Sequence, residues 1–264
     1  MKVYISVDFE GIAGSTSCES TNLGDLEHGP LAKEMTMEAV AACEGALAAG
    51  ATEIYVKDAH DSGRNMDISL FPKEVKIIRD WTCDPNSMIG GLDSSFDAVM
   101  YVGYHSPAGL NGSPLSHTMN RRNNYVKYNG RLASEFLIHA YAAASMSVPS
   151  VFLSGDKMLC DHVHEYDPQM ETAAVKEGLG SATISVAPVM AHEMIREGAK
   201  KGLENIKNCH LEVPETITME ICFKDHWNAK RASYYPGVKL LDAYTVSYTA
   251  ENMEDLMAAR MFIL

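Results

Sequence analysis

The first eleven residues constrain the fold of this chain more than any other stretch. β-Branched apolar residues at positions 3, 5 and 7 alternate with other side chains, which predicts a buried β-strand. The strand leads into Asp8 and Glu10, which share one side if the extended backbone continues. Gly11 then permits a sharp turn. Because ligands bind beyond the carboxyl ends of strands in open α/β sheets, this acidic pair is a candidate cation site. A solvated acidic turn is the alternative interpretation.

A helix and a second strand are predicted next, and they complete a parallel βαβ unit with the first strand. Residues 30–49 begin with proline, carry a narrow Ala-rich face and are followed by glycine, as expected of a helix. Residues 52–57 form the strand, which ends close to His60. Parallel strands bring their carboxyl ends to one edge of a sheet, so Asp8, Glu10 and His60 are expected to lie together.

A third strand also ends close to a ligand-type side chain. Residues 98–102 are almost purely apolar, and His105 follows them. The helix predicted over residues 132–147 carries Glu135 near its start and His139 four positions later, so the two side chains share one helix face. A lone histidine after a strand is ordinarily a polar loop residue, but three strand ends of this kind in register favour a common site.

The whole pattern predicts an α/β fold with a mostly parallel central sheet flanked by helices in three layers, and a smaller C-terminal α+β part. We expect one catalytic unit over residues 1–264, with a candidate subdivision into residues 1–155 and 156–264. Further strands are expected at 75–78, 149–154, 182–186, 216–223 and 243–249, a hairpin at 125–131, and helices at 157–166, 188–207 and 250–264.

Composition and charge exclude several classes of partner. The formal net charge of −13 argues against nucleic acid and anionic membranes. No segment approaches the ~20 apolar residues that span a bilayer, and no signal peptide is recognisable at the N-terminus. The six cysteines are scattered without a C-x-x-C motif, which favours reduced thiols in a cytoplasmic protein.

The candidate site residues carry nitrogen and oxygen donors that suit zinc, with manganese or cobalt as alternatives. They are too many for one catalytic zinc, which takes three protein ligands, and they suit two metals ~3.5–4 Å apart that share a carboxylate. Such a pair points to hydrolysis of an amide, ester or phosphate. The candidates are Asp8, Glu10, His60, His105, His117 and Glu135.

An ordered set of sequence blocks resembles the zinc-dependent D-aminopeptidase family, the self-compartmentalising bacterial peptidases. The resemblance covers roughly the first two thirds of the chain, and the ordered set is more specific than any single block. The blocks are VDFEGIAG at 7–14, KDAHDS at 57–62, MIGGLD at 88–93, VGYH at 102–105, LSHTM at 115–119, SEF at 134–136, VFLSGD at 151–156 and TAAVK at 172–176.

This resemblance implies a dinuclear zinc site. Asp8 would bridge two zinc ions, Glu10 and His60 would complete one metal site, and His105 and Glu135 would complete the other.

The resemblance also implies a catalytic residue and an assembly. His117 would act beside the metals as nucleophile, proton donor or oxyanion stabiliser. The substrate would be a short peptide with an N-terminal D-residue. The protein would form a homo-oligomer, a ring-shaped decamer whose sites face an inner chamber.

Two further residues are candidates for supporting roles. Asp58 could orient His60, although a strand-end turn explains it equally well. The family pattern does not require His139, which is either near the metals or a buried or interface histidine.

Two adjacent arginines are candidate ligands for the substrate. Arg121 and Arg122 could bind a substrate carboxylate, with a solvated hairpin flank as the simpler interpretation.

One alternative function keeps the metals and changes the substrate to another small amide or a cell-wall peptide. A second alternative is a non-catalytic metal-binding or ligand-binding α/β protein.

Overall fold

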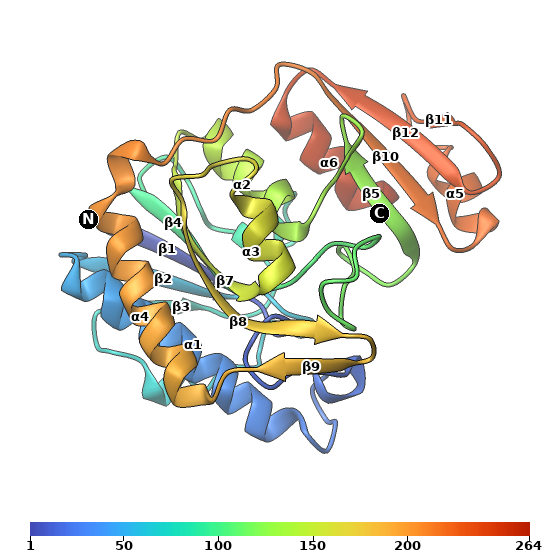
Figure 1. Ribbon diagram of the computed structural model, residues 1–264. Helices are drawn as coiled ribbons and strands as arrows, with labels where there is room; N and C mark the ends of the chain where they lie inside the picture. Colours follow the sequence, from blue (N-terminus) through green and yellow to red (C-terminus); the bar gives the residue numbers. More distant parts are fainter.

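The computed structural model describes all 264 residues, which form two β-sheets and the helices packed on them (Figure 1). The strands are β1 (Lys2–Val7), β2 (Glu53–Asp58), β3 (Val75–Ile78), β4 (Ala98–Tyr104), β5 (Asn123–Tyr128), β6 (Arg131–Leu132), β7 (Ser150–Asp156), β8 (Glu171–Leu179), β9 (Ala182–Ser185), β10 (Ile217–Phe223), β11 (Lys239–Leu240) and β12 (Thr245–Ala250). The α-helices are α1 (His28–Ala48), α2 (Glu135–Ser145), α3 (Lys157–Val163), α4 (Pro188–Glu204), α5 (His226–Ala232) and α6 (Met253–Ile263). Short 3₁₀ turns are η1 (Cys18–Ser20), η2 (Ile68–Leu70), η3 (Ser87–Ile89) and η4 (Ile206–Asn208).

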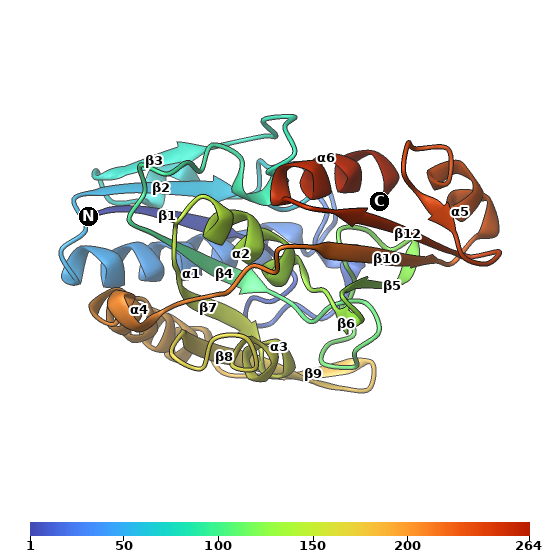
Figure 2. The ribbon, with the colours of Figure 1, turned by 90° about the horizontal axis from the view of Figure 1, so that it is seen from above.

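The larger sheet confirms the predicted α/β architecture. Its seven strands run in the order β3-β2-β1-β4-β7-β8-β9, and every neighbouring pair is parallel except β8–β9. Helices α1 and α4 cover one face, and α2 and α3 cover the other (Figures 1 and 2). Strand β1 is fully buried from its second residue because apolar layers lie on both of its faces. The carboxyl ends of the central strands therefore meet at one edge.

The smaller sheet is antiparallel, with the order β11-β12-β10-β5-β6. The predicted hairpin around residues 125–131 is confirmed as β5–β6. Its turn residues Asn129 and Gly130 have φ values of 48° and 83°, as a two-residue hairpin turn requires. Since β5 and β6 lie in the middle of the chain and β7 to β9 return to the larger sheet, the chain alternates between the sheets. The single catalytic unit and the subdivision at residue 155 stay predictions.

Four details differ from the expected elements. Strand β8, strand β11 and helix α5 were not predicted, because β8 does not alternate regularly in burial and the other two elements are too short to show a clear period. The helix expected from residue 132 begins at Glu135, since Leu132 pairs with Lys127 in the small sheet. The Ser134 hydroxyl then accepts a hydrogen bond from the Leu137 amide (3.1 Å) and caps the helix.

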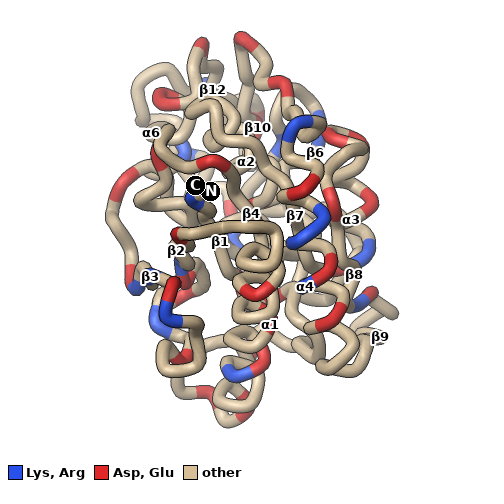
Figure 3. Tube along the Cα trace, turned by 90° about the vertical axis from the view of Figure 1, so that its left-hand side faces the viewer, with Lys and Arg blue, Asp and Glu red and all other residues tan.

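The predicted partners and location depend on the charged residues, the cysteines and the hydropathy of the helices. Asp and Glu positions are spread around the molecule and interspersed with Lys and Arg (Figure 3). All six cysteines are free, and the cytoplasmic location inferred from them stays a prediction. None of the helices combines the length and the apolar character needed to cross a bilayer.

The turn after β1 stays hydrogen-bonded to the neighbouring strand. The Asp8 amide donates to Val102 O (2.8 Å), and the Gly11 amide donates to Gly103 O (2.7 Å). A Cβ atom at Gly11 would lie 1.8 Å from Tyr104 O, so only glycine permits this approach. The turn is thereby fixed beside the end of β4, where His105 follows.

Helices α1 and α4 pack closely, and a glycine sets their separation. A Cβ atom at Gly45 would lie 2.3 Å from Arg196 O and 3.0 Å from the Ala199 Cβ. Gly29, in the first turn of the same helix, has no such neighbour within 4 Å.

The two glycines give a matched test of this packing. Gly45→Ala should lower the free energy of unfolding by ~1–3 kcal/mol, because the added methyl group overpacks the helix contact. Gly29→Ala should raise it by up to ~1 kcal/mol, because alanine favours the helix. Urea denaturation of both variants checks this, and shifts of the same sign would contradict the packing.

Candidate metal centre

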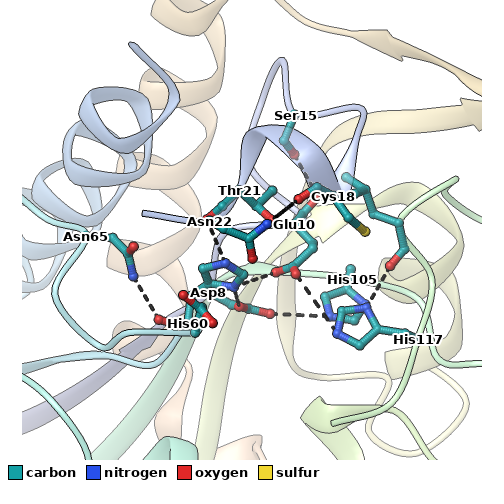
Figure 4. A network of polar contacts seen from close by, with 12 residues as sticks. Asp8, Glu10, Ser15, Cys18, Thr21, Asn22, His60, Asn65, His105 and His117 are labelled. Atoms are coloured by element: carbon teal, nitrogen blue, oxygen red, sulfur yellow. Dashed lines mark hydrogen bonds and ion pairs between the residues drawn. The ribbon is translucent and has the colours of Figure 1, made fainter. Parts of the chain in front are cut away.

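Six side chains converge at the carboxyl edge of the larger sheet, and Figure 4 labels all of them except Glu135. Two of them follow β1, one follows β2 and one follows β4. A fifth opens helix α2, and the sixth lies in the segment before β5. All are buried except His117, which is partly exposed. The six are Asp8, Glu10, His60, His105, Glu135 and His117.

Asp8 lies at the centre of the cluster. Its Oδ1 is 3.3 Å from His60 Nδ1, and its Oδ2 is 3.4 Å from His105 Nε2. His60 Nδ1 also lies 2.9 Å from Glu10 Oε2, and His105 Nε2 lies 3.5 Å from Glu135 Oε2. Each carboxylate oxygen of Asp8 therefore faces a different histidine, and each histidine also faces a second carboxylate.

His117 closes the open side of the cluster. Its Nε2 is 3.5 Å from Glu135 Oε1 and 4.0 Å from Glu10 Oε1. Its ring stacks on that of His105, with 4.3 Å between the centroids.

Backbone carbonyls fix which ring nitrogen of each histidine faces the cluster. His60 Nε2 lies 3.0 Å from Thr21 O, His105 Nδ1 lies 3.0 Å from Ser106 O, and His117 Nδ1 lies 2.8 Å from Leu115 O. A carbonyl only accepts hydrogen bonds, so each of these nitrogens carries the proton. The other nitrogen is then directed at the carboxylates, which is the arrangement found around metal-binding histidines.

Burial and charge set the protonation of the cluster. Burial, followed by repulsion from Glu10, raises the pKa of Asp8 to about 7. Burial also disfavours the charged form of Glu135, but His105 outweighs it and lowers the pKa of Glu135 to about 2. Burial opposes protonation of His60 and His105 too, yet Glu10 and Glu135 respectively raise the pKa values of the two histidines well above normal. Positive charge is therefore favoured at both histidine positions.

The donor set fits divalent cations. Asp8 Oδ2 and His105 Nε2 are buried and have no hydrogen-bond partner, which is costly unless a cation contacts them. Two groups of three residues have ligand atoms within 4.8 Å of one another. One is Asp8, Glu10 and His105, and the other is His105, His117 and Glu135. His60 belongs to neither group but lies beside the first.

Comparison with known proteins identifies the family. The family model of peptidase M55, described as D-aminopeptidase, matches residues 1–262. The chain belongs to the M55 D-aminopeptidase family.

A sequence comparison and a structural comparison agree with the assignment of this M55 family member. The D-aminopeptidase of Bacillus subtilis (strain 168) is 30% identical over 266 residues, with coverage of 99% of this chain and 96% of the relative. A solved structure, the "Zn-dependent D-aminopeptidase DppA from Bacillus subtilis, a self-compartmentalizing protease", superposes with a TM-score of 0.93 at 28% identity. It covers 100% of this chain and 96% of that chain. The predicted family and enzyme class, a hydrolase of the aminopeptidase type, are confirmed, and the non-catalytic alternative is not retained.

Asp58 and His139 lie beside the centre of this M55 peptidase rather than in it. The Asp58 carboxylate accepts hydrogen bonds from the Asn65 amide (2.6 Å), Asn65 Nδ2 (2.9 Å) and the Met66 amide (2.9 Å). Asn65 Nδ2 also donates to His60 O (2.8 Å), so Asp58 reaches His60 only through Asn65.

His139 Nδ1 donates to the backbone carbonyl of Glu135 (2.7 Å). Burial, reinforced by the Arg260 charge, lowers the pKa of His139 to about 3.

One buried cation was not anticipated. Lys176 in β8 donates from Nζ to the Glu10 carbonyl, to Ser15 O (2.8 Å) and to Ser15 Oγ (2.6 Å). Burial lowers the pKa of Lys176 to about 8. Lys176 thus stabilises the turn that carries Glu10 through three hydrogen bonds. Its signal in the sequence is a lysine inside the resemblance block at 172–176.

The centre opens into a cavity of about 380 Å³. Its walls come from the turns after β1 and β2, from Trp81 and from the segment that carries His117. Asp61 has a φ of 40° and accepts a hydrogen bond from Trp81 Nε1 through its carbonyl (2.7 Å). The remaining wall residues include Cys18, Thr21, Asn22, Met88, Met119, Asn120 and Arg121.

Proposed function

We propose that this D-aminopeptidase is a dinuclear zinc enzyme that removes the N-terminal D-residue from short peptides. The observation that carries the proposal is Asp8, whose two carboxylate oxygens face different histidines at 3.3 and 3.4 Å. Asp8 would bridge the two metals. Glu10 and His60 would complete one site, and His105 and Glu135 the other. Manganese or cobalt would suit the same donors.

The metals and the protein have separate tasks in this proposal. When bound, a metal pair lowers the pKa of water and offsets the negative charge that develops during amide hydrolysis. Asp61, the carboxylate of the cavity wall outside the proposed ligand set, would attract the ammonium group of a peptide. His117 has the geometry of a proton carrier, because Leu115 O holds its Nδ1 proton and its Nε2 faces the cavity near Glu135. Its Nε2 would deliver a proton to the departing amine.

Metal content and stereoselectivity test the function together. We expect about two zinc ions per chain by elemental analysis, and hydrolysis of D-alanyl p-nitroanilide well above that of L-alanyl p-nitroanilide. A chelator should abolish cleavage, and added zinc should restore it. Asp8→Asn should lose metal and activity, whereas His210→Gln, which alters an exposed histidine, should lose neither.

Two results would contradict this function. Bound metal without D-selective cleavage would favour another small amide or a cell-wall peptide as substrate. Absence of metal after zinc loading at neutral pH would refute the dinuclear centre.

The role of His117 has its own test. His117→Ala should lower kcat by ~10²- to 10⁴-fold, the usual contribution of a positioned acid or base, while the zinc content stays unchanged. The matched control is His192→Ala, because His192 also faces a carboxylate, Glu34 Oε1 at 3.0 Å, but lies outside the cavity. Unchanged turnover in the His117 variant would remove His117 from the mechanism.

We further propose that the chain assembles into the ring-shaped decamer implied by the resemblance. The description of the solved relative as self-compartmentalizing supports an oligomer. Two sets of exposed apolar side chains could form its contacts. One set surrounds the smaller sheet: Trp227, Tyr234, Leu240, Leu241, Tyr244 and Phe262. The other lies on the β8–β9 hairpin and the start of α4: Leu179, Ile184, Val189 and Met190.

Light scattering tests the assembly. A decamer should have about ten times the 28.9 kDa mass of one chain. A particle with the mass of a single chain would contradict the proposal.

A further inference from the structure

We propose that Arg121 binds the free C-terminal carboxylate of the peptide substrate and so makes this enzyme selective for short peptides over their amides. The inference rests on the proposed function, since it assigns the second end of the same substrate. The segment from His117 to the start of β5 lines the cavity and contains Arg121.

Side-chain hydrogen bonds hold this segment in one conformation. The Met119 amide donates to Glu135 Oε1 (2.6 Å), and Met119 has a φ of 61°. Asn123 Nδ2 donates to Thr118 O (2.9 Å) and Asn120 O (3.1 Å). The backbone at Arg121 is therefore fixed relative to the metal-binding carboxylate Glu135, which is the preorganisation that selective recognition needs.

The two adjacent arginines differ in what they contact. Arg122 Nη2 donates to Leu264 O (2.9 Å), and Asn120 Nδ2 donates to the same oxygen atom (2.9 Å). These contacts tie the segment to the end of α6. The guanidinium of Arg121, in contrast, makes no hydrogen bond or ion pair with the rest of the chain. It is exposed at the cavity and available to a ligand.

The charges on the cavity wall give Arg121 its selectivity. Four carboxylates line the cavity, and Arg121 is the only lysine or arginine among the lining residues. Because Asp8, Glu10 and Glu135 are the proposed metal ligands, the metals would offset their charges. Arg121 is then the one permanently positive side chain of the wall that is free to pair with a peptide carboxylate, and Asp61 is the one carboxylate that is free to attract the ammonium end.

The geometry of the two groups points to a short substrate. A guanidinium forms paired hydrogen bonds with a carboxylate, an arrangement that lysine cannot reproduce. The cavity of about 380 Å³ is near the lower limit for small-molecule sites, so a peptide whose two ends both bind within it must be short. A dipeptide or tripeptide with a free carboxylate fits this description.

Three substrates separate this inference from the proposed function. The zinc-loaded protein is assayed with D-Ala-D-Ala, with the C-terminal amide of D-Ala-D-Ala, and with D-alanyl p-nitroanilide, which has no carboxylate. Arg121→Met should lower kcat/KM for the free dipeptide by ~10- to 100-fold, the range for a charge-assisted contact. It should change the values for the amide and the anilide by less than ~3-fold.

Two variants serve as controls. Arg121→Lys should retain part of the preference for the free dipeptide, because it keeps the charge and loses the paired hydrogen bonds. Arg231→Met removes one exposed positive charge from α5, away from the cavity, and should leave all three values unchanged.

The outcomes are distinguishable. Equal losses on all three substrates in Arg121→Met, or no loss on any, would overturn the role of Arg121 while the D-aminopeptidase function stands. If the wild-type protein cleaves none of them, the proposed function fails. Calorimetric binding of the free dipeptide and its amide then decides the inference, and equal affinities would overturn it.

Discussion

Three buried carboxylates that converge with three histidines at one edge of a sheet are the constraint on which the rest of the structure depends. Asp8, Glu10 and Glu135 lie close enough to repel one another, and low-dielectric surroundings strengthen that repulsion. Only positive charge held between them makes the arrangement stable. The histidines supply it when protonated, and divalent metals would supply it during catalysis. The tight turn at Gly11 and the β4 hydrogen bonds serve to hold this unfavourable group together.

Much of this arrangement could be predicted from the sequence. Strands rich in β-branched residues that end at Asp8, His60 and His105 define one edge of a parallel sheet, because topology alone brings their ends together. The position of Glu135 followed from its place at a helix start. The ordered blocks then added the family, which the family model and the matches to the D-aminopeptidase of Bacillus subtilis confirm.

Other features depended on contacts that sequence spacing does not encode. Asp58 was considered as a partner of His60, but the amides of the following turn compete successfully for its carboxylate. Strand β8 was missed because a polar residue does not mark its exposed face: Lys176 is buried, and its ammonium group donates to backbone carbonyls. The difference in contacts between Arg121 and Arg122 could not be predicted either, because Arg122 is bound by Leu264, far along the chain.

The contact between Lys176 and the Glu10 turn has a consequence for the order of folding. It joins residues 166 positions apart, so the acidic turn receives its buried cation only after β8 has docked beside β7. Contacts of this sequence separation form late, because closing a long loop costs entropy before the contact repays it. A partly synthesised chain that ends before β8 therefore contains the six side chains but lacks the contact between Lys176 and the Glu10 turn. The contacts that hold the walls of the centre therefore form in sequence: the one from Lys176 needs β8, and those from Asn120 and Arg122 to Leu264 need α6 as well.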